Sequence, residues 1–273
     1  MPRRLRLDAE LVRRGLARSR EQASALILDG QVSVAGMRAT KPATGVTTDQ
    51  AIVVSSTDEE SYASRGAHKL IGALNAYTPR GLQVAGRRCL DAGASTGGFT
   101  DVLLRSGARE VVAVDVGYGQ LVWELRNDER VVVLDRTNVR DVTVELIGGP
   151  VDLVTADLSF ISLTLVLPAL TAVCAPGADL ALMVKPQFEV GKERLGRGGV
   201  VREPELRSEA VLSVARAAGA LGWGTGGVEA SPLPGPSGNV EYFLWLRRDA
   251  GPVTQEMVDE AVAQGPTGEK VAR

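Results

Sequence analysis

A glycine-rich turn follows one apolar stretch and precedes an amphipathic one, in the run Asp91-Ala-Gly-Ala-Ser-Thr-Gly-Gly-Phe-Thr100. Glycines let a backbone approach a ligand closely, and free N–H groups at the start of a helix bind electronegative atoms. The spacing differs from the G-x-G-x-x-G dinucleotide fingerprint, and no Lys-Ser/Thr pair follows as in a P-loop. The alternative is an ordinary strand-to-helix turn. We predict a ligand-binding loop, with contacts from Asp91, Gly93, Ser95, Gly97, Gly98 and Phe99.

Polar positions beyond the next two predicted strands extend this site. Asp115 ends the next strand, about 20 residues past the glycines, where an acid in a doubly wound fold accepts ribose hydroxyls. Asn138 and Val139 follow the third strand, where an adenine ring would lie in such a fold. The alternatives are a solvated acid at the end of a strand for Asp115 and a turn residue bonding its own backbone for Asn138.

Charged residues after two later strands have the chemistry of a proton-transfer site. Asp157 and Lys185 each follow an apolar run, and open α/β sheets bind ligands at the carboxyl ends of their strands. Burial and a neighbouring cation would lower the pKa of Lys185 and make a neutral base available near pH 7. The alternative for each residue is a solvated charge, with the lysine reaching out to water.

Lysine is scarce in this chain, so each lysine position is informative. Five of the 31 basic residues are lysines. Lys185 is one, and Lys69, on a predicted helix before the sheet, is another. Glu241 begins the last predicted strand. Taken singly, Lys69 and Glu241 are each expected to be solvated charges.

Alternating strand and helix patterns from residue 88 onward predict the fold that must position these side chains. Such alternation is typical of a parallel sheet covered by helices, with right-handed crossovers. We therefore predict an α/β, Rossmann-like domain. The strands are expected at 89–92, 111–116, 131–134, 153–156, 180–185 and 240–246. The helices are expected at 64–77, 98–106, 119–127, 163–174 and 204–221.

The first 55 residues carry a different pattern, which predicts a small α+β module. Ser19 and Gln22 fit a capping box at the start of a helix that ends at Gly30. Residues 1–45 hold nine Arg or Lys against four Asp or Glu, a charge of +5, although the whole chain carries −2. Such asymmetry indicates a basic module on a near-neutral body. The other expected elements are a helix at 7–16 and strands at 31–34 and 51–54.

Composition excludes several classes of protein. No apolar run approaches the roughly 20 residues of a membrane helix, and the basic N-terminus lacks the apolar stretch of a signal peptide. Two cysteines cannot make a disulfide framework, and the single histidine, His68, has no metal-ligand spacing around it. We therefore expect a soluble cytoplasmic protein without a metal. The expected domains are 1–60 (basic module and linker), 61–250 (α/β domain) and 251–273 (a flexible tail).

The motifs together resemble a known family. Asp91-x-Gly-Ala-x-x-Gly-Gly-Phe-Thr100 resembles the cofactor loop of FtsJ-type S-adenosylmethionine-dependent ribose methyltransferases, which carry a Lys-Asp-Lys-Glu tetrad. Lys69, Asp157, Lys185 and Glu241 occur in that order. The N-terminal module resembles the RNA-binding domain named after ribosomal protein S-four. The combination, over residues 3–248, closely resembles the TlyA family of rRNA 2′-O-methyltransferases, often labelled haemolysins.

This resemblance implies methylation of cytidine 2′-hydroxyls in ribosomal RNA of the small subunit, the large subunit or both, with assembled subunits as partners. It implies S-adenosylmethionine as cofactor, with Asp157 helping to place it. Lys185 would be the base, oriented by Asp157. Lys69 would steer the hydroxyl, and Glu241 would hold a lysine. The residues expected to contact RNA phosphates are Arg4, Arg6, Arg18, Arg20 and Arg65.

Other classes stay open from the sequence alone. A ribosome-associated RNA-binding assembly factor with a weak or inactive methyltransferase domain has the same modules. A nicotinamide dehydrogenase shares the fold class, but the glycine spacing disfavours it. A pore-forming haemolysin would need membrane-spanning segments, and none is visible. One departure from the family is the turn Ala35-Gly36, where an Asn-Gly type is usual.

Overall fold

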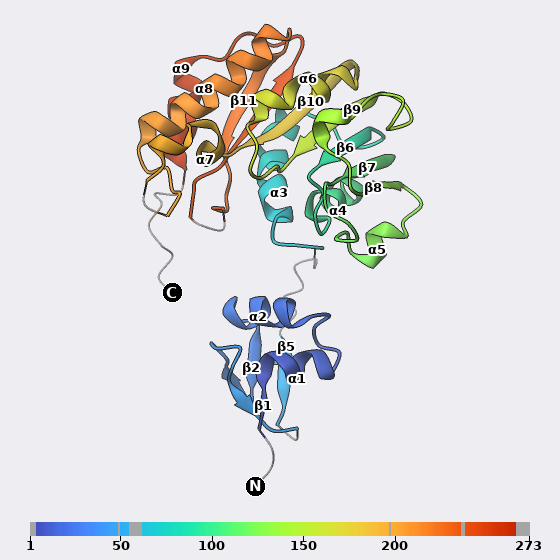
Figure 1. Cartoon of the computed structure of the whole chain (residues 1–273), viewed down its shortest axis with the longest axis vertical. Coiled ribbons are helices and arrows are strands. Elements are labelled where there is room, and N and C mark those ends of the chain that lie inside the picture. Colours follow the sequence, from blue (N-terminus) through green and yellow to red (C-terminus); the bar gives the residue numbers. More distant parts are fainter. Residues whose placement is uncertain (1–3, 49, 55–61, 197, 236–237, 266–273) are drawn as a thin grey trace. The chain divides into compact units, whose positions relative to one another are not determined.

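Two sets of apolar residues build two separate units in the computed structural model, which describes residues 4–48, 50–54, 62–196, 198–235 and 238–265 (Figure 1). One unit spans Met1–Ser61 and the other Tyr62–Arg273. The linker expected at 55–60 lies outside the described residues.

The N-terminal unit is a small α+β module, as predicted. Strand β2 lies between β3 and β5 in one antiparallel sheet, and β1 pairs with β4 in a second. Leu7, Leu11, Ile27 and Val46 fill its core and are fully buried. The elements are β1 (Leu5–Arg6), α1 (Leu7–Arg13), α2 (Arg20–Leu28), β2 (Val32–Val34), β3 (Met37–Arg38), β4 (Gly45–Val46) and β5 (Ile52–Val54).

One of the two contacts of the predicted capping box forms at the start of α2. The Ser19 side chain accepts a hydrogen bond from the Gln22 N–H at the start of α2, which confirms the predicted N-cap. The Gln22 side chain instead accepts from the Arg18 N–H, one residue earlier than a capping box requires. Ala35 and Gly36 have φ of 49° and 79°, the geometry of a two-residue hairpin that favours Asn-Gly. The hairpin therefore forms with alanine at a position that suits asparagine better.

The larger unit contains a seven-stranded sheet in the order β11-β12-β10-β9-β6-β7-β8. The five strands from β10 to β8 are parallel, and β12 runs antiparallel to both β10 and β11. The strands are β6 (Arg88–Ala92), β7 (Glu110–Val114), β8 (Val131–Leu134), β9 (Val151–Ala156), β10 (Cys174–Val184), β11 (Gly224–Ala230) and β12 (Tyr242–Arg247).

The strand order reverses between β6 and β9. The chain proceeds from β6 to β7 and β8 on one side, then returns to add β9 and β10 on the other side. Ligands of open α/β sheets bind in the crevice at such a switch point, outside the carboxyl ends of the strands. The fold therefore predicts one ligand crevice, beside the residues that follow β6 and β9.

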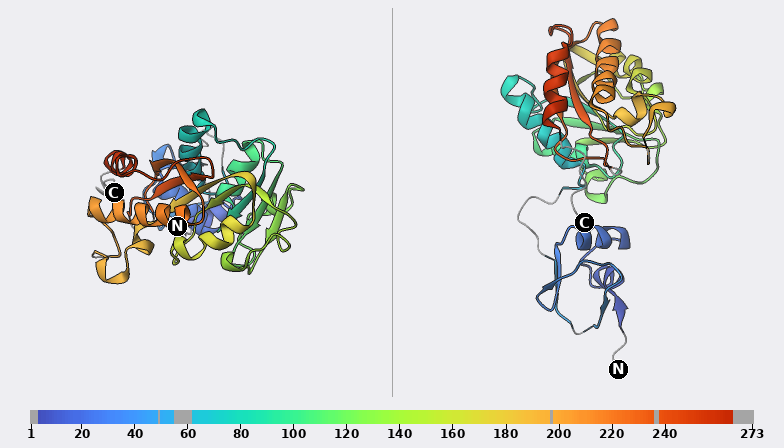
Figure 2. Two further views of the ribbon diagram at one scale, coloured as in Figure 1. Left: turned by 90° about the horizontal axis from the view of Figure 1, so that it is seen from above. Right: turned by 90° about the vertical axis from the view of Figure 1, so that its left-hand side faces the viewer.

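Helices cover both faces of this sheet (Figures 1 and 2). Alternate side chains of β6 enter different cores, because successive residues of a strand point to opposite faces. Cys89 packs with α3, α4 and α5, whereas Leu90 belongs to the core that includes α6, α8 and α9. The helices are α3 (Ala67–Tyr77), α4 (Gly98–Arg105), α5 (Trp123–Arg126), α6 (Leu167–Ala172), α7 (Pro186–Glu189), α8 (Pro204–Ala220) and α9 (Gln255–Gln264).

Several predicted elements are corrected. The helix expected at 163–174 is a 3₁₀ turn, η3 (Leu163–Leu165), followed by α6, because Pro168 has no N–H to continue a helix and sits in the first turn of a new one. The helix expected at 119–127 is reduced to α5, since Gly119 has φ of 66°. Strand β11 was not predicted, because its three glycines weaken the strand pattern.

The predicted flexible tail is wrong for most of its described part. Residues Gln255–Gln264 form helix α9, which begins at Thr254, whose side chain accepts from the Met257 N–H. Val258 and Ala261 are buried in the same core as α8. Met257 and Val262 of α9 also pack against this core, so the apolar residues of the helix dock it on the domain. The remainder of the expected tail, from residue 266, lies outside the described residues.

Candidate active site

The glycine loop after β6 lies at the predicted crevice. The Gly93 N–H donates to the Val114 carbonyl, and the Asp157 N–H donates to the Ala92 carbonyl, which ties the loop to the ends of β7 and β9. Gly93 has φ of 86°, and a Cβ there would lie 2.7 Å from the Asp157 carbonyl oxygen. Glycine at this position therefore allows the loop to pass close to the residue that ends β9.

The other two glycines of the loop allow close packing within the protein. Gly97 has φ of 103°, and a Cβ there would clash with Leu125. A Cβ on Gly98 would clash with the Ser64 hydroxyl and would lie 3.0 Å from the Ala67 nitrogen, at the start of α3. The N-terminal ends of α3 and α4 thus meet at Gly98. These glycines therefore allow the loop to pack closely against α3 and α5, and their contact with a ligand stays a prediction.

Asp91 is a fully buried carboxylic acid beneath this loop. The Thr100 hydroxyl donates to its Oδ2 at 2.7 Å, and its Oδ1 has no hydrogen-bond partner. Burial, together with the nearby carboxylates of Asp157 and Asp115, raises the pKa of Asp91 from 3.8 to about 7, although the hydrogen bonds from Thr100 oppose this rise. The core of the site therefore holds an acid that gains a proton easily.

Replacing Asp91 with asparagine is expected to change how stability depends on pH. The folded pKa of Asp91 exceeds the unfolded one, so the folded chain binds the proton more tightly and wild-type stability falls as pH rises from about 4 to about 7. Asp91→Asn removes this dependence. Above pH 7 it should be more stable than wild type by on the order of 2 kcal/mol, after the cost of the buried amide. Urea unfolding at pH 5 and pH 8 measures the free energy of unfolding of both proteins. If the difference between variant and wild type is the same at both pH values, the expectation is wrong.

Asp115 is held at the next strand end as an acceptor. Its Oδ2 accepts from the Ser95 N–H at 2.8 Å, and its Oδ1 accepts from the Gly117 N–H at 2.7 Å. Ser95 itself has φ of 48°. Each carboxylate oxygen has a further lone pair, so Asp115 retains the capacity to accept two ribose hydroxyls. The side chain of Val116, which follows it, is 68% exposed and offers an apolar surface beside them.

Three predicted cofactor residues are placed differently from the expectation. The Phe99 ring is buried against Phe243, with ring centroids 6.0 Å apart, and the Val139 side chain is also buried in the core. Neither side chain is available to a ligand. The Asn138 oxygen accepts from the Arg140 N–H, which is the turn role considered as its alternative.

Two ion pairs, each of a buried lysine with an acid, lie where β10 ends and β12 begins. Lys69 Nζ is 2.5 Å from Glu241 Oε2, and Lys185 Nζ is 2.5 Å from Asp157 Oδ1. Tyr242 pairs with Val184 in the antiparallel register, so Glu241 and Lys185 lie at the same end of these strands. Glu241 has no exposed surface, and Lys69 is 9% exposed. The structure thus brings the four predicted residues together as two ion pairs at one edge of the sheet.

Side chains that the sequence analysis gave no role also belong to this site. The Ser159 hydroxyl accepts from Lys185 Nζ at 3.1 Å. Phe160 is 90% exposed, has φ of 65°, and lies 5.3 Å from Phe188, ring centroid to ring centroid. An exposed aromatic residue in the left-handed region is strained, and such strain is typical of functional sites. In the sequence, the position of Ser159 and Phe160 shortly after Asp157 was the signal that could have assigned them to the site.

In the N-terminal unit, buried acids orient predicted RNA-binding arginines. Asp8 is 3% exposed and accepts from Arg6 and from Arg20, which lowers the pKa of Asp8 to about 2. The Arg6 and Arg20 side chains remain 53% and 60% exposed. Two guanidinium groups are therefore fixed on the surface with part of each open to a ligand. Arg4, Arg18 and Arg65 are exposed.

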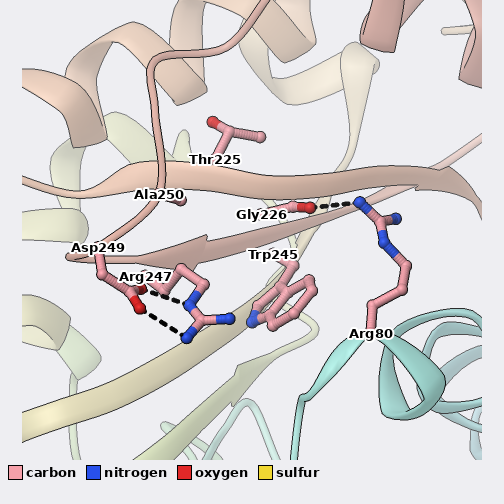
Figure 3. A pocket seen from close by; sticks show the side chains of 7 residues that line it. All are labelled: Arg80, Thr225, Gly226, Trp245, Arg247, Asp249 and Ala250. Carbon is pink, nitrogen blue, oxygen red and sulfur yellow. Dashed lines mark hydrogen bonds and ion pairs between the residues drawn. The ribbon is translucent and has the colours of Figure 1, made fainter.

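A hollow of about 300 Å³ lies at the opposite edge of the sheet (Figure 3). Arg247, which lines it, lies opposite Asp179 in the pairing of β12 with β10. This is the end of the two strands away from Lys185. Its guanidinium is engaged by Asp249, and that of Arg80 donates to the Gly226 carbonyl. Because both cations already have partners, this hollow lacks free charge for an anion and is separate from the site.

Among the residues that the structure describes, no group of three or more His, Cys, Asp or Glu could hold a metal ion. None of the described helices combines the length and apolarity needed to span a bilayer.

Known proteins resemble both units. The FtsJ-like methyltransferase family matches residues 62–248, and the S4 domain matches residues 5–52. The chain is 60% identical over 271 residues to the 16S/23S rRNA (cytidine-2′-O)-methyltransferase TlyA of Mycobacterium tuberculosis, covering 97% of this chain and all of the relative. It is 35% identical to the 23S rRNA (cytidine-2′-O)-methyltransferase TlyA of Campylobacter jejuni, over 68% of this chain and 71% of the relative.

A solved structure agrees with these matches. A protein from Streptococcus thermophilus, described as a hemolysin, is 36% identical and aligns with a TM-score of 0.75, over 97% of this chain and 96% of the other. The match to both sequence and fold extends over nearly the whole chain. An S4 domain followed by this sheet, with its two lysine–acid pairs, therefore places the chain in the TlyA family of FtsJ-like methyltransferases.

Proposed function

We propose that this chain transfers the methyl group of S-adenosylmethionine to the 2′-hydroxyl of cytidine in ribosomal RNA of the small subunit, the large subunit or both. The observation that carries the proposal is the pairing of Lys185 with Asp157 at the switch point of the sheet, beside the glycine loop. Relatives named for this reaction match both units of the chain. Its place of action is the cytoplasm, where ribosomes are.

The residues around the glycine loop fit S-adenosylmethionine. Asp115 has acceptor capacity for the ribose hydroxyls, and the exposed Val116 can pack against the adenine ring. Asp157 ends β9 next to Gly93 and supplies negative charge for a cation. When bound, S-adenosylmethionine supplies an electrophilic methyl group on a positively charged sulfur.

Lys185 is proposed as the base that accepts the proton of the 2′-hydroxyl. A ribose hydroxyl is a poor nucleophile at neutral pH, so it needs a base and close alignment. Asp157 favours the charged ammonium of Lys185, so this lysine must release a proton before it can act. The 2′-oxygen would gain the methyl group as the bond between the methyl carbon and the donor sulfur breaks, and its proton would pass to Lys185 Nζ.

Lys69 is proposed to steer the hydroxyl and its neighbouring phosphate. Its ammonium lies 2.5 Å from the carboxylate of the buried Glu241, which would hold Lys69 in position. A fixed cation near the reacting oxygen stabilises negative charge that develops as the proton leaves. Phe160, exposed at the rim, offers an aromatic face on which the target base can stack once it is turned out of the RNA.

The basic N-terminal module is proposed to supply affinity for RNA. Removing the charge of Arg6 and Arg20 together, as Arg6→Gln and Arg20→Gln, keeps amide donors for Asp8 and should lower RNA affinity about tenfold at moderate salt. The slope of log affinity against log salt should fall by about 2, since each phosphate contact contributes close to one unit. Filter binding to isolated ribosomal subunits at several salt concentrations measures both quantities.

A matched control is Arg130→Gln. Arg130 pairs with Asp128 two residues away, as Arg6 pairs with Asp8, and its side chain is 45% exposed. It lies before β8, at the edge of the sheet away from the site. S-adenosylmethionine binding should be unchanged in both variants. An unchanged salt slope in the Arg6/Arg20 variant would show that the module does not bind phosphates through these side chains.

The test of the reaction is transfer of a tritiated methyl group to isolated small and large ribosomal subunits, followed by mapping of the labelled ribose. Label on cytidine 2′-oxygens supports the proposal. Binding of subunits with no transfer, under conditions in which S-adenosylmethionine also binds, would favour an assembly factor with an inactive domain.

A further inference from the structure

Two loops that carry the proposed site run next to each other without strand pairing. The register between β9 and β10 extends to Ala156 and Leu182. Beyond it, the loop 157–162 follows β9 and begins with Asp157. Lys185 follows β10 and lies at the N-cap of helix α7. Ladder hydrogen bonds no longer fix their separation, so side chains must do so.

Side-chain contacts join these loops at three points. Lys185 contacts Asp157 and Ser159 at the start, and Phe160 packs against Phe188 in the middle. At the far end, Glu189 Oε2 accepts from the Ser162 hydroxyl at 2.5 Å and Oε1 accepts from the Leu163 N–H at 2.8 Å. We propose that Glu189 is a positioning residue, which holds the loop 157–162 against α7 and so sets the placement of Asp157 and Phe160 relative to Lys185.

The chemistry of Glu189 fits this role. It is half-buried, and burial raises its pKa, while both of its oxygens receive hydrogen bonds from the neighbouring loop. Hydrogen bonds to a carboxylate are stronger than those between neutral groups, and two of them fix direction as well as distance. The two bonds from Ser162 and Leu163 offset the cost of partly burying this carboxylate, and they attach α7 to the segment that follows β9.

The strained residue of the loop supplies a second reason. Phe160 lies two residues before Ser162 and adopts φ of 65° with its ring almost wholly exposed. Such a conformation persists only where the surroundings fix it. The Phe160 ring packs against Phe188, and the Glu189 carboxylate holds Ser162 two residues further along the loop; Phe188 and Glu189 are adjacent in α7. Without Glu189 the loop can relax, and Asp157 and Ser159 move with it.

The experiment compares Glu189→Ala with Glu189→Gln in the full chain. The inference rests on the proposed function, so methyl transfer to ribosomal subunits is the assay. Glu189→Ala should lower kcat about 30-fold, within the range of up to about 100-fold that a displacement of 1 Å costs, with KM for S-adenosylmethionine unchanged. Glutamine can accept from Leu163 and donate to the Ser162 oxygen, so Glu189→Gln should keep kcat within about threefold of wild type.

Two further variants make the result specific. Glu209→Ala is the matched control, because Glu209 forms an exposed ion pair with Arg194 and should leave kcat unchanged. Ser162→Ala should lose several-fold in kcat, and should add nothing to Glu189→Ala, because both remove the same contact. If Glu189→Ala does not fold, kcat of Ser162→Ala is compared with kcat of Glu189→Gln. The positioning role then requires a several-fold loss in Ser162→Ala and near wild-type kcat in Glu189→Gln.

The outcomes separate this inference from the proposed function. A wild-type chain that transfers no methyl group overturns the proposed function. An active wild type with a folded Glu189→Ala variant at wild-type kcat overturns the positioning role alone. The same role is also overturned by fully additive losses in the double variant, or by a loss confined to KM.

Discussion

Lys185→Ala should reduce single-turnover methyl transfer by about 10²- to 10⁴-fold while S-adenosylmethionine still binds. This is the range that a positioned general base contributes, and Lys185 is the basic group closest to the crevice residue Asp157. Lys185 is 7% exposed, so its charge is available to Asp157 and Ser159 and hardly to water. Single-turnover transfer of tritiated methyl to ribosomal subunits measures the loss, and isothermal titration measures binding of the methyl donor.

Lys192→Ala is the control for this prediction. Lys192 lies a few residues further on, in the 3₁₀ turn Lys192–Arg194, and is exposed. It should transfer methyl at the wild-type rate. Full single-turnover activity in Lys185→Ala would show that another group removes the proton, or that alignment alone suffices. Lys185→Arg should be nearly as inactive as alanine, because a guanidinium does not release its proton near neutral pH.

Glu241→Ala should destabilise the larger unit by about 3–5 kcal/mol. It removes the partner of Lys69 and leaves an ammonium that is 9% exposed without its ion pair, which is the costly way to break a buried pair. The remaining neighbour of Lys69 Nζ is the Met183 sulfur at 3.9 Å, a weak acceptor. Urea unfolding of the full chain, followed by the fluorescence of its tryptophans, measures the change in free energy.

A double variant separates stability from chemistry at this pair. Lys69→Met with Glu241→Leu replaces the ion pair by apolar groups, and should recover most of the lost stability while methyl transfer stays low. Glu110→Ala is the control, because Glu110 is 33% exposed and its partner Arg88 keeps backbone carbonyl partners. It should cost about 1 kcal/mol or less. If Glu241→Ala is as stable as Glu110→Ala, the Lys69 ammonium must be hydrated once its partner is removed, and the predicted destabilisation is wrong.

The sequence predicted the parts of this site that depend on the ends of strands. Asp157 and Lys185 follow apolar runs, and parallel strands bring such positions to one edge. Pairing between Lys69 and Glu241 could not be derived from spacing, since they are 172 residues apart and meet only because β12 runs antiparallel beside β10. The resemblance to a family supplied that association.

Other features depend on packing that a single sequence does not reveal. Phe99 and Val139 lie in motifs with the correct spacing, but their side chains point into the core. Glu189 looks like any surface acid until the loop after β9 is seen to meet it. Strand β11 and helix α9 give weak sequence patterns although both pack well in the structure. The glycines of β11 and the few apolar residues of α9 are the cause.

Gly98 has a consequence for how this protein can vary. The absence of a side chain there lets the start of α3 rest on the start of α4. Helix α3 carries Lys69, and α4 follows the cofactor loop. Any larger residue at 98 would push the two helices apart and would move Lys69 away from Glu241. Positions 64 and 98 are therefore expected to covary among relatives, because the Ser64 side chain occupies the space that a larger residue at 98 would need.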